Sequence, residues 1–349
     1  MSGLNRPALK GGLLAFLAAT LFGISTPLVQ SVGGGVGAFT TAALLYAGAA
    51  LVGALLRQPA EREAAIHKGD LPRLGWMALF GAGLGPVALA WGLQHTSGTS
   101  ASLMLTLEAV FTALLARALY GEVMDRRVWS AMALLFMGGI VLILDRGSSG
   151  TNELLGALAV LGATLSWGID NTLSRSVAER DPGQVVLVKS AFGVALTVLI
   201  ANIMGETLPS WSTVAGLLMI GGAGYGLSLR LYLLAQRAFG AARTGSVFAF
   251  APFIGAVVAV ALGDRSMSWG VALGGTLMLL GVMLHLVESH GHEHVHEELT
   301  HEHAHAHDDG HHTHRHDPMP VGPHSHAHRH EPTRHTHAHV PDAHHTHRH

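Results

Sequence analysis

Residues 19–32 read ATLFGISTPLVQSV, and residues 163–177 read ATLSWGIDNTLSRSV. The two stretches share their opening and a Gly-Ile step, and the second has one extra residue. A second pair of similar stretches covers residues 108–122 and 250–264. Glycines four residues apart match as well: Gly81 and Gly85 with Gly222 and Gly226. Three matches in the same order, 141–145 residues apart, indicate that the chain contains one unit twice.

The chain around this repeat has the composition of a membrane protein. Of its 349 residues, 49% are hydrophobic and 13% are charged, whereas a soluble domain carries about 25% charged residues. It has no cysteine, which excludes a disulfide scaffold and a Cys-ligated zinc or iron–sulfur site. A formal net charge of −2 offers no basic surface for nucleic acid. The sequence therefore predicts a polytopic protein embedded in a lipid bilayer.

Ten stretches are long and apolar enough to cross a bilayer, which takes about 20 residues of helix. The predicted spans are 12–32, 36–56, 74–94, 99–120, 128–145, 154–174, 184–204, 212–236, 243–262 and 269–287. Each repeat holds five spans, in residues 11–146 and 152–287. Because five is odd, the second copy enters the membrane upside down, an architecture typical of secondary transporters. The predicted fold is an all-α polytopic membrane protein with two inverted five-helix repeats and a polar tail, residues 288–349.

Lysine and arginine set the predicted orientation. With the N-terminus in the cytoplasm, twelve of these residues precede, join or follow the spans on the cytoplasmic side: Arg6, Lys10, Arg57, Arg62, Lys68, Arg73, Arg126, Arg127, Arg175, Arg180, Arg237 and Arg243. The outer loops hold Arg146 and Arg265. This positive-inside bias predicts that both termini are cytoplasmic. The first apolar stretch is too long for a signal peptide and lacks a small-residue cleavage site.

The chain resembles the drug/metabolite transporter superfamily, EamA type, over residues 11–287. The resemblance is carried by Leu21-Phe22-Gly23, the stretch from Ala101 to Glu122, Trp167 to Asn171, Ala241 to Gly245 and Ala251 to Gly255. It implies ten helices in two EamA repeats and export of small metabolites or drugs across a bacterial cytoplasmic (inner) membrane. The tail lies outside the family pattern.

Ionisable residues inside the spans are the strongest functional candidates, because a charge in the hydrocarbon region must face protein or a water-filled cavity. Glu108 lies near the predicted midplane and is a candidate for proton or substrate coupling, or else a structural carboxyl. Asp170 and Lys189 lie about 8–10 Å from the cytoplasmic surface on consecutive antiparallel spans, so they can meet. They form either a helix-pinning ion pair, or an inner gate or a contact with substrate charge. Asn171 is expected to donate to one of them, and Arg230 either joins them or snorkels to the surface.

Prolines and small polar residues mark further candidates for the substrate pathway. Pro27, Pro86 and Pro252 each remove a helical hydrogen bond. The carbonyls freed in this way, those of Gly23, Ala82 and Phe248, either bind substrate or cation or only permit a kink. Ser25 and Thr26 align with Asp170 and Asn171, which suggests opposite ends of one pathway. Trp167 and Tyr225 are expected to line the cavity.

The tail contains 23 of the 26 histidines. Its clearest repeats are two His-x-His runs: His301, His303, His305 and His307, then His324, His326, His328 and His330. It has almost no large apolar residue, so it is predicted to be disordered. Histidine-rich tracts suggest metal binding, and imidazole suits Zn, Cu and Ni; the expected ions at the tail are Zn, Ni or Co. The alternative is a solubilising segment with incidental affinity.

The leading functional prediction is a secondary exporter of small organic solutes that works by alternating access. No phosphate-binding loop is present, which argues against ATP hydrolysis, and no nucleophile–base or metal-ligand set in the spans indicates an enzyme. We expect no required cofactor and a monomer or homodimer. The first rival is a divalent-cation exporter whose tail collects Ni, Co or Zn, and the second is a membrane sensor of metal or pH.

Overall fold

The computed structural model describes residues 6–59, 62–121, 124–174, 177, 180–239 and 241–286, and four short tail segments. The first half contains α1 (Arg6–Val32), α2 (Ala38–Leu56), η1 (Lys68–Asp70), α3 (Leu71–Met77), η2 (Ala78–Leu84), α4 (Gly85–Leu93), α5 (Gly98–Met104), α6 (Leu107–Tyr120) and α7 (Arg126–Ser149). The second half contains α8 (Thr151–Ser174), α9 (Pro182–Ile203), α10 (Trp211–Gly221), η4 (Gly222–Leu227), α11 (Ser228–Phe239), α12 (Ala241–Phe248), α13 (Ala251–Ala261) and α14 (Trp269–Leu286).

These helices build the predicted spans. Nine helical segments of the described chain are long and apolar enough to cross a membrane. The tenth, Trp269–Leu284, is a shorter apolar helix that packs along α7. Several helices begin at side-chain caps that accept a backbone N–H: Ser97, Asp125, Asp181 and Ser210. The all-α polytopic fold predicted from the sequence is confirmed.

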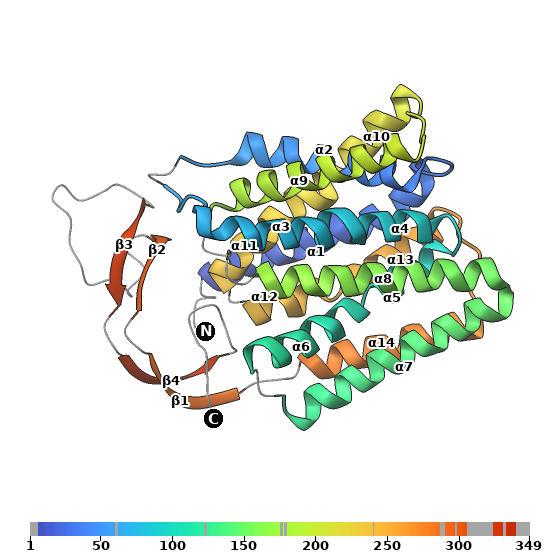
Figure 1. Cartoon of the computed structure of the whole chain (residues 1–349). Helices are drawn as coiled ribbons and strands as arrows, with labels where there is room; N and C mark the ends of the chain where they lie inside the picture. The colour runs from blue at the N-terminus through green and yellow to red at the C-terminus, as the bar shows by residue number, and fades with distance from the viewer. Residues whose placement is uncertain are drawn as a thin grey trace.

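Two pairs of helices lie on the axis that relates the repeats. α2 packs on α9, and α7 packs on α14; Figure 1 shows the first pair along one side of the bundle and the second along the other. Off this axis, α1 packs on α11 and α13 of the second repeat, while α8 packs on α4 and α6 of the first. The repeats therefore interlock, because the first helix of each is held by the third and fourth spans of the other.

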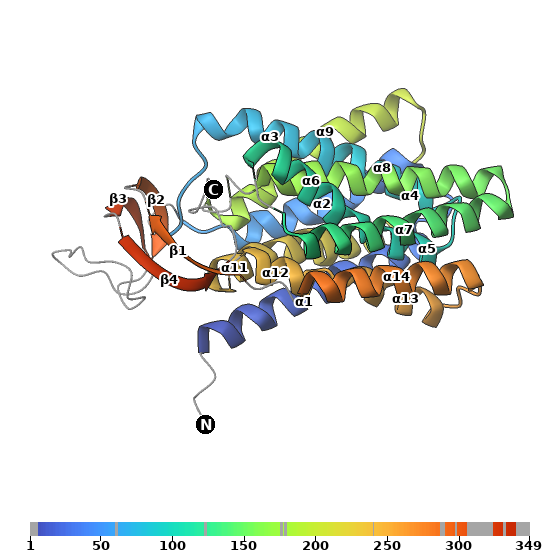
Figure 2. The same ribbon diagram turned by 90° about the horizontal axis from the view of Figure 1, so that it is seen from below.

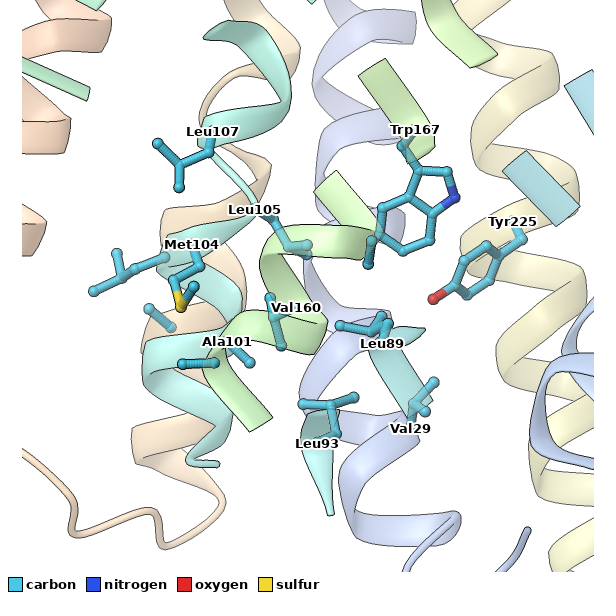
Figure 3. Close-up of a cluster of buried hydrophobic side chains, with 14 of the residues drawn as sticks. Val29, Leu89, Leu93, Ala101, Met104, Leu105, Leu107, Val160, Trp167 and Tyr225 are labelled. Atoms are coloured by element: carbon cyan, nitrogen blue, oxygen red, sulfur yellow. The ribbon is translucent and has the colours of Figure 1, made fainter. Parts of the chain in front are cut away.

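The helices run nearly along one direction, and the bundle has two distinct ends (Figure 2). We call the end where α1 begins and α14 ends the terminal end. The opposite end carries the connections 33–37, 94–97, 204–210 and 262–268. Between the two ends lies a continuous apolar core; Figure 3 shows part of it, which extends from Leu89 and Val160 to Leu105 and the ring of Trp167.

Four short strands occur in the tail, which differs from its predicted disorder. They are β1 (His290–His296), β2 (Leu299–His305), β3 (His324–His330) and β4 (Thr333–His339). β1 pairs with β4 and β2 with β3, both antiparallel. The physical reason is the two-residue period of the His-x-His pattern, which suits an extended chain, and pairing satisfies the backbone without an apolar core.

Side-chain ties close the opposite end of the bundle between spans of different repeats. Glu206 accepts hydrogen bonds from the backbone N–H groups of Phe39 and Thr40 at the start of α2. Asp264 Oδ2 accepts from both the N–H and the hydroxyl of Thr99, each at 2.8 Å. The second contact joins the loop after α13 to the start of α5, so it holds the fourth and ninth spans together.

We expect the Asp264 tie to weaken in acid. Partial desolvation acts to raise the pKa of Asp264, but hydrogen bonds from Ser266 and Thr99 outweigh it and hold the pKa below its usual value. A carboxyl with a lowered folded-state pKa contributes stability above its unfolded pKa of about 4 and loses it as pH falls through the folded value. Asp264→Asn should therefore cost roughly 1 kcal/mol near pH 7, because the site is partly exposed.

The measurement is the melting temperature of the wild type and of Asp264→Asn in detergent between pH 3 and pH 7. The gap between the two proteins should shrink below about pH 4. A gap that stays constant over this range would contradict the role of the charged carboxylate.

Candidate functional site

Two spans are broken near their middles, one in each repeat. In the first repeat α5 ends at Met104 and α6 begins at Leu107, so Glu108 lies in the first turn of α6. In the second repeat α12 ends at Phe248, and α13 begins at Ala251 with Pro252 in its first turn. Pro252 therefore starts a new helix rather than kinking a continuous one, because its missing N–H is not needed there.

The broken helices meet on one side of the break and separate on the other. α5 and α13 pack against each other in the half near the opposite end. In the half near the terminal end, α6 packs on α7 and α8, whereas α12 packs on α1, α11 and α14. The two breaks thus lie where the fourth and ninth spans part.

Glu108 is held by an amide from the second repeat. Asn171 Nδ2 on α8 donates a hydrogen bond to Glu108 Oε1. The expectation that Asn171 donates to Asp170 or Lys189 is therefore wrong, because Asn171 and Asp170 are neighbours on a helix and point in different directions. Both Glu108 and Asn171 are half-buried. A carboxyl at this depth must face protein or a water-filled cavity rather than lipid, since an ionisable group in hydrocarbon is costly.

Asp170 and Lys189 meet as predicted. Lys189 Nζ on α9 donates to Asp170 Oδ2 on α8, and both residues are buried. The carboxylate of Asp170 occupies the space that a side chain at Gly81 would need. Its other oxygen, Oδ1, has no hydrogen-bond donor in the described part of the chain. A glycine in η2 is thus what admits the ion pair to the core.

The carbonyl of Gly81 is a second feature of η2. η2 is a π-helix in which the Gly85 N–H bonds to Phe80 O, so the next donor in that register would be Pro86, which has no N–H. Two side chains replace it: Tyr46 Oη donates to Gly81 O, and Trp167 Nε1 donates at 3.0 Å. The sequence expectation named the carbonyl of Ala82; the π-register moves the side-chain donors to Gly81.

Aromatic rings from both repeats surround these polar groups. Tyr225 lies 5.5 Å from Tyr46 and 6.3 Å from Trp167, measured between ring centroids, and Figure 3 shows Trp167 and Tyr225 side by side. Phe22 lies edge-on to Trp167 at 5.8 Å and continues the row to Phe248 at 5.4 Å.

Sequence reasoning found Trp167 and Tyr225 but missed the other rings of this row: Phe22, Tyr46, Tyr232 and Phe248. These rings lie in ordinary apolar stretches, where no local pattern separates a cluster member from a lipid-facing ring. The one available signal was their position, since Phe22 aligns with Trp167 in the repeat.

Ser25 occupies the place in the first repeat that Asp170 has in the second. Ser25 donates to Phe22 O at 2.6 Å, and its side chain fills the space beside Gly224 in the π-helix η4. Asp170 beside Gly81 in η2 is the equivalent contact, so packing pairs Gly81 with Gly224 rather than with Gly222. Ser25 and Asp170 therefore make equivalent contacts in the two repeats, each beside a glycine of a π-helix.

The remaining predicted site residues lie around this centre. Thr26 is buried, and its hydroxyl has no partner in the described chain. Pro27 lies inside α1, where the Gly23 carbonyl packs against the position of a Cβ at Gly255, 2.8 Å away. Arg230 donates to Leu56 O at the end of α2, 3.2 Å away. Its guanidinium thus caps that helix at the terminal end, in line with snorkelling.

No group of three or more metal-ligating side chains occurs among those the structure describes. The tail shows a regular backbone register instead: His301, His303 and His305 in β2 lie opposite His328, His326 and His324 in β3. His330 lies opposite Leu299, and His307 lies outside the described residues.

Inverted repeats with broken helices around a buried polar centre are the architecture of secondary membrane transporters. The model of the EamA-like transporter family matches residues 9–144 and again residues 154–287. The chain therefore belongs to the EamA-like transporter family, and it is a multi-pass membrane transporter.

Similar proteins support the assignment of the chain as a membrane transporter. An uncharacterized transporter of Methanothermobacter thermautotrophicus is 26% identical over 234 residues, which cover 66% of this chain and 68% of the relative. A Pseudomonas fluorescens protein named "probable 4-amino-4-deoxy-L-arabinose-phosphoundecaprenol flippase subunit ArnE" is 40% identical over 68 residues, 20% of this chain and 59% of that protein. A solved crystal structure covering 80% of this chain and 97% of its own superposes with a TM-score of 0.57 at 20% identity, which supports the fold.

Proposed function

We propose that the protein is a secondary transporter that exports small organic solutes across the cytoplasmic membrane by alternating access. The observation that carries the proposal is the pair of broken spans, α5–α6 and α12–α13, which part beside a buried polar and aromatic centre. Two similar halves of opposite orientation can exchange between states of comparable energy, open to one side or the other.

The proposed orientation of the substrate pathway across the membrane rests on the distribution of Lys and Arg between the two ends. The count of twelve Lys and Arg residues against two supports a cytoplasmic terminal end, with both termini on that side. The ties at Glu206 and Asp264 then close the periplasmic side, and the half where α6 and α12 separate faces inward. This arrangement corresponds to an inward-open state, which can bind substrate from the cytoplasm.

Glu108 is the proposed coupling residue, with Asn171 holding its carboxyl toward the centre. The equivalent position in the second repeat is Phe250, so the repeat does not duplicate this charge. The Asp170–Lys189 pair is proposed to fix α8 against α9, because both ends are withdrawn from water.

A second candidate, efflux of a divalent metal cation such as Ni, Co or Zn, is favoured by the tail. The facing histidines of β2 and β3 present imidazole, which these ions bind well, at a regular spacing. If the protein exports metal, the tail either delivers metal ions to the membrane-spanning helices or senses their concentration.

One vesicle experiment separates the two candidates. Full-length protein and a form cut after Glu288 are reconstituted, and flux of amino acids, nucleobases, drugs and divalent metals is followed across an imposed pH gradient. A cysteine introduced at Gly150 of this Cys-free chain reports sidedness, because the proposed orientation places it outside.

We expect both forms to carry organic solutes equally, since the tail adds no span. The shortened form should lose high-capacity Zn or Ni binding, because His67, His95 and His285 alone remain. Metal flux in neither form would exclude the metal exporter, and organic-solute flux in neither form would exclude the leading proposal.

A further inference from the structure

The backbone carbonyl of Gly23 on α1 has lost its helical donor. Pro27 lies four residues further along the same helix, and proline has no N–H to give to that carbonyl. In a membrane, a carbonyl freed in this way needs another group to satisfy it, because no bulk water reaches it. Such carbonyls bind Na⁺ in several transporter folds with interrupted helices.

A buried hydroxyl lies beside this carbonyl. Ser102, in the last turn of α5, is 1% exposed, and its Oγ has no hydrogen-bond partner among the described residues. A Cβ built at Gly255 on α13 would lie 2.8 Å from Gly23 O and 2.9 Å from Ser102 Oγ. Oxygens of α1 and α5 therefore converge on one glycine of α13 without bonding to each other.

The inverted repeat does not reproduce this arrangement. Gly168 aligns with Gly23, and the residue four positions further on is Thr172, which has an N–H and whose hydroxyl also donates to Gly168 O at 2.7 Å. The residue that aligns with Gly255 is Ala113, whose methyl group occupies the corresponding place. A carbonyl without its donor and a glycine facing it thus occur together in one half only.

We infer that Gly23 O and Ser102 Oγ are two ligands of a Na⁺ site between α1, α5 and α13. Hard cations bind oxygen ligands of this kind, and an ion between the two atoms would satisfy both at once. Ser102 also lies at the C-terminal end of its helix, where the partial negative charge of the backbone favours a cation. This inference deepens the proposed function, on which the role of the ion in transport rests.

The composition of the site selects the kind of ion. Neither ligand is charged, whereas divalent cations in proteins are usually held by carboxylates, so a monovalent ion fits better. The close approach of both oxygens to Gly255 favours Na⁺ over the larger K⁺. Thr26 lies one turn from Gly23 on the same face of α1, and its buried hydroxyl, without a described partner, offers a third oxygen.

The position of the site predicts its effect on conformation. α1, α5 and α13 pack against one another in the half of the bundle near the opposite end, where the proposed orientation has the periplasmic side closed. An ion that joins α1 to α5 against α13 stabilises this packing. Bound Na⁺ should therefore favour the inward-open state, since a ligand shifts an equilibrium toward the state that it binds better.

The test measures binding of radiolabelled Na⁺ to the full-length protein in detergent, with choline as the replacing cation. Ser102→Ala removes one proposed ligand. Pro27→Ala restores an N–H that can bond to Gly23 O and so withdraws the carbonyl from the ion. Ser100→Ala is the matched control, because Ser100 lies on the same helix and is buried without a described partner, but is not among the atoms nearest Gly255.

Na⁺ should bind saturably at one site per chain and raise the melting temperature by about 3 °C at ten times its Kd. Ser102→Ala and Pro27→Ala should each weaken binding at least about tenfold, the loss expected for one contact between an ion and an oxygen. Ser100→Ala should leave binding unchanged. In choline both test variants should stay folded, since one loses a hydroxyl without a partner and the other gains a helical hydrogen bond.

Three results would overturn the inference: no saturable Na⁺ binding, equal affinity for K⁺, or Na⁺ binding that survives both Ser102→Ala and Pro27→Ala. Flux in vesicles separates this failure from failure of the proposed function. Solute flux in a protein that binds no Na⁺ would sustain the transporter and overturn the site. Na⁺ binding that needs Ser102, without flux of any solute, would sustain the site and overturn the transporter.

Discussion

Asp170→Ala should be the most damaging single substitution in the polar centre. It leaves the ammonium of Lys189, which is 4% exposed, without its carboxylate partner. Breaking a buried ion pair by removing one partner costs about 3–5 kcal/mol, because a charge then remains buried and uncompensated. We expect the melting temperature in detergent to fall by about 10 °C.

The pair Asp170→Ala with Lys189→Ala tests the reason for this loss. Removing both partners leaves no buried charge, so the double variant should be more stable than Asp170→Ala alone. Glu63→Ala is a comparison variant, since it removes the acid of the Arg237 ion pair at the terminal end. That pair is more exposed than Asp170–Lys189, so its loss should cost less. A double variant that shows the sum of the two single losses would contradict the ion-pair explanation.

Gly221→Ala should also destabilise the protein strongly, although alanine favours helix over glycine by about 1 kcal/mol. A Cβ at position 221 would collide with the backbone carbonyl of Leu45 on α2, and one at Gly48 would meet Leu218 O in the same contact. Because the obstacle is backbone, the helices must move apart, at a cost of about 1–3 kcal/mol or more.

Gly162→Ala is the matched control for this prediction. Gly162 is also a glycine inside a span, on α8, but nothing lies within 4 Å of a Cβ built there. The same added methyl group should be neutral or stabilising by up to about 1 kcal/mol. Melting temperatures and yields of folded protein are the readouts, and a change of the same sign at both positions would show that packing does not decide the outcome.

Features that depend on local pattern could be predicted from the sequence. Spans are recognisable because each needs a continuous apolar run, and the inverted repeat because two such sets resemble each other. The Asp170–Lys189 contact followed from the depth of two residues on consecutive antiparallel spans, which is a one-dimensional argument. The metal role of the tail stays a prediction.

Hydrogen-bond partners on spans distant in the sequence could not be predicted from the depth of each residue along its span. Whether Asn171 turns to Glu108 or to Lys189 depends on how α8 is rotated about its axis. The choice between the carbonyls of Gly81 and Ala82 depends on a π-turn, which adds a residue and rotates the remainder of the helix by about 100°. The sequence pattern cannot predict such a rotation, because the span 74–94 is hydrophobic on all sides and its apolar residues do not mark one face.

The sequence by itself determined that this is a membrane protein of two inverted five-helix repeats with single acidic and basic residues in its spans. Hydrophobic length, charge asymmetry and internal similarity are sufficient for that, because the bilayer imposes them on any spanning chain. The tertiary structure alone decided that Glu108 accepts a hydrogen bond from Asn171, while Lys189 pairs with Asp170. That choice comes from close helix packing, which fixes which side chains share one small space.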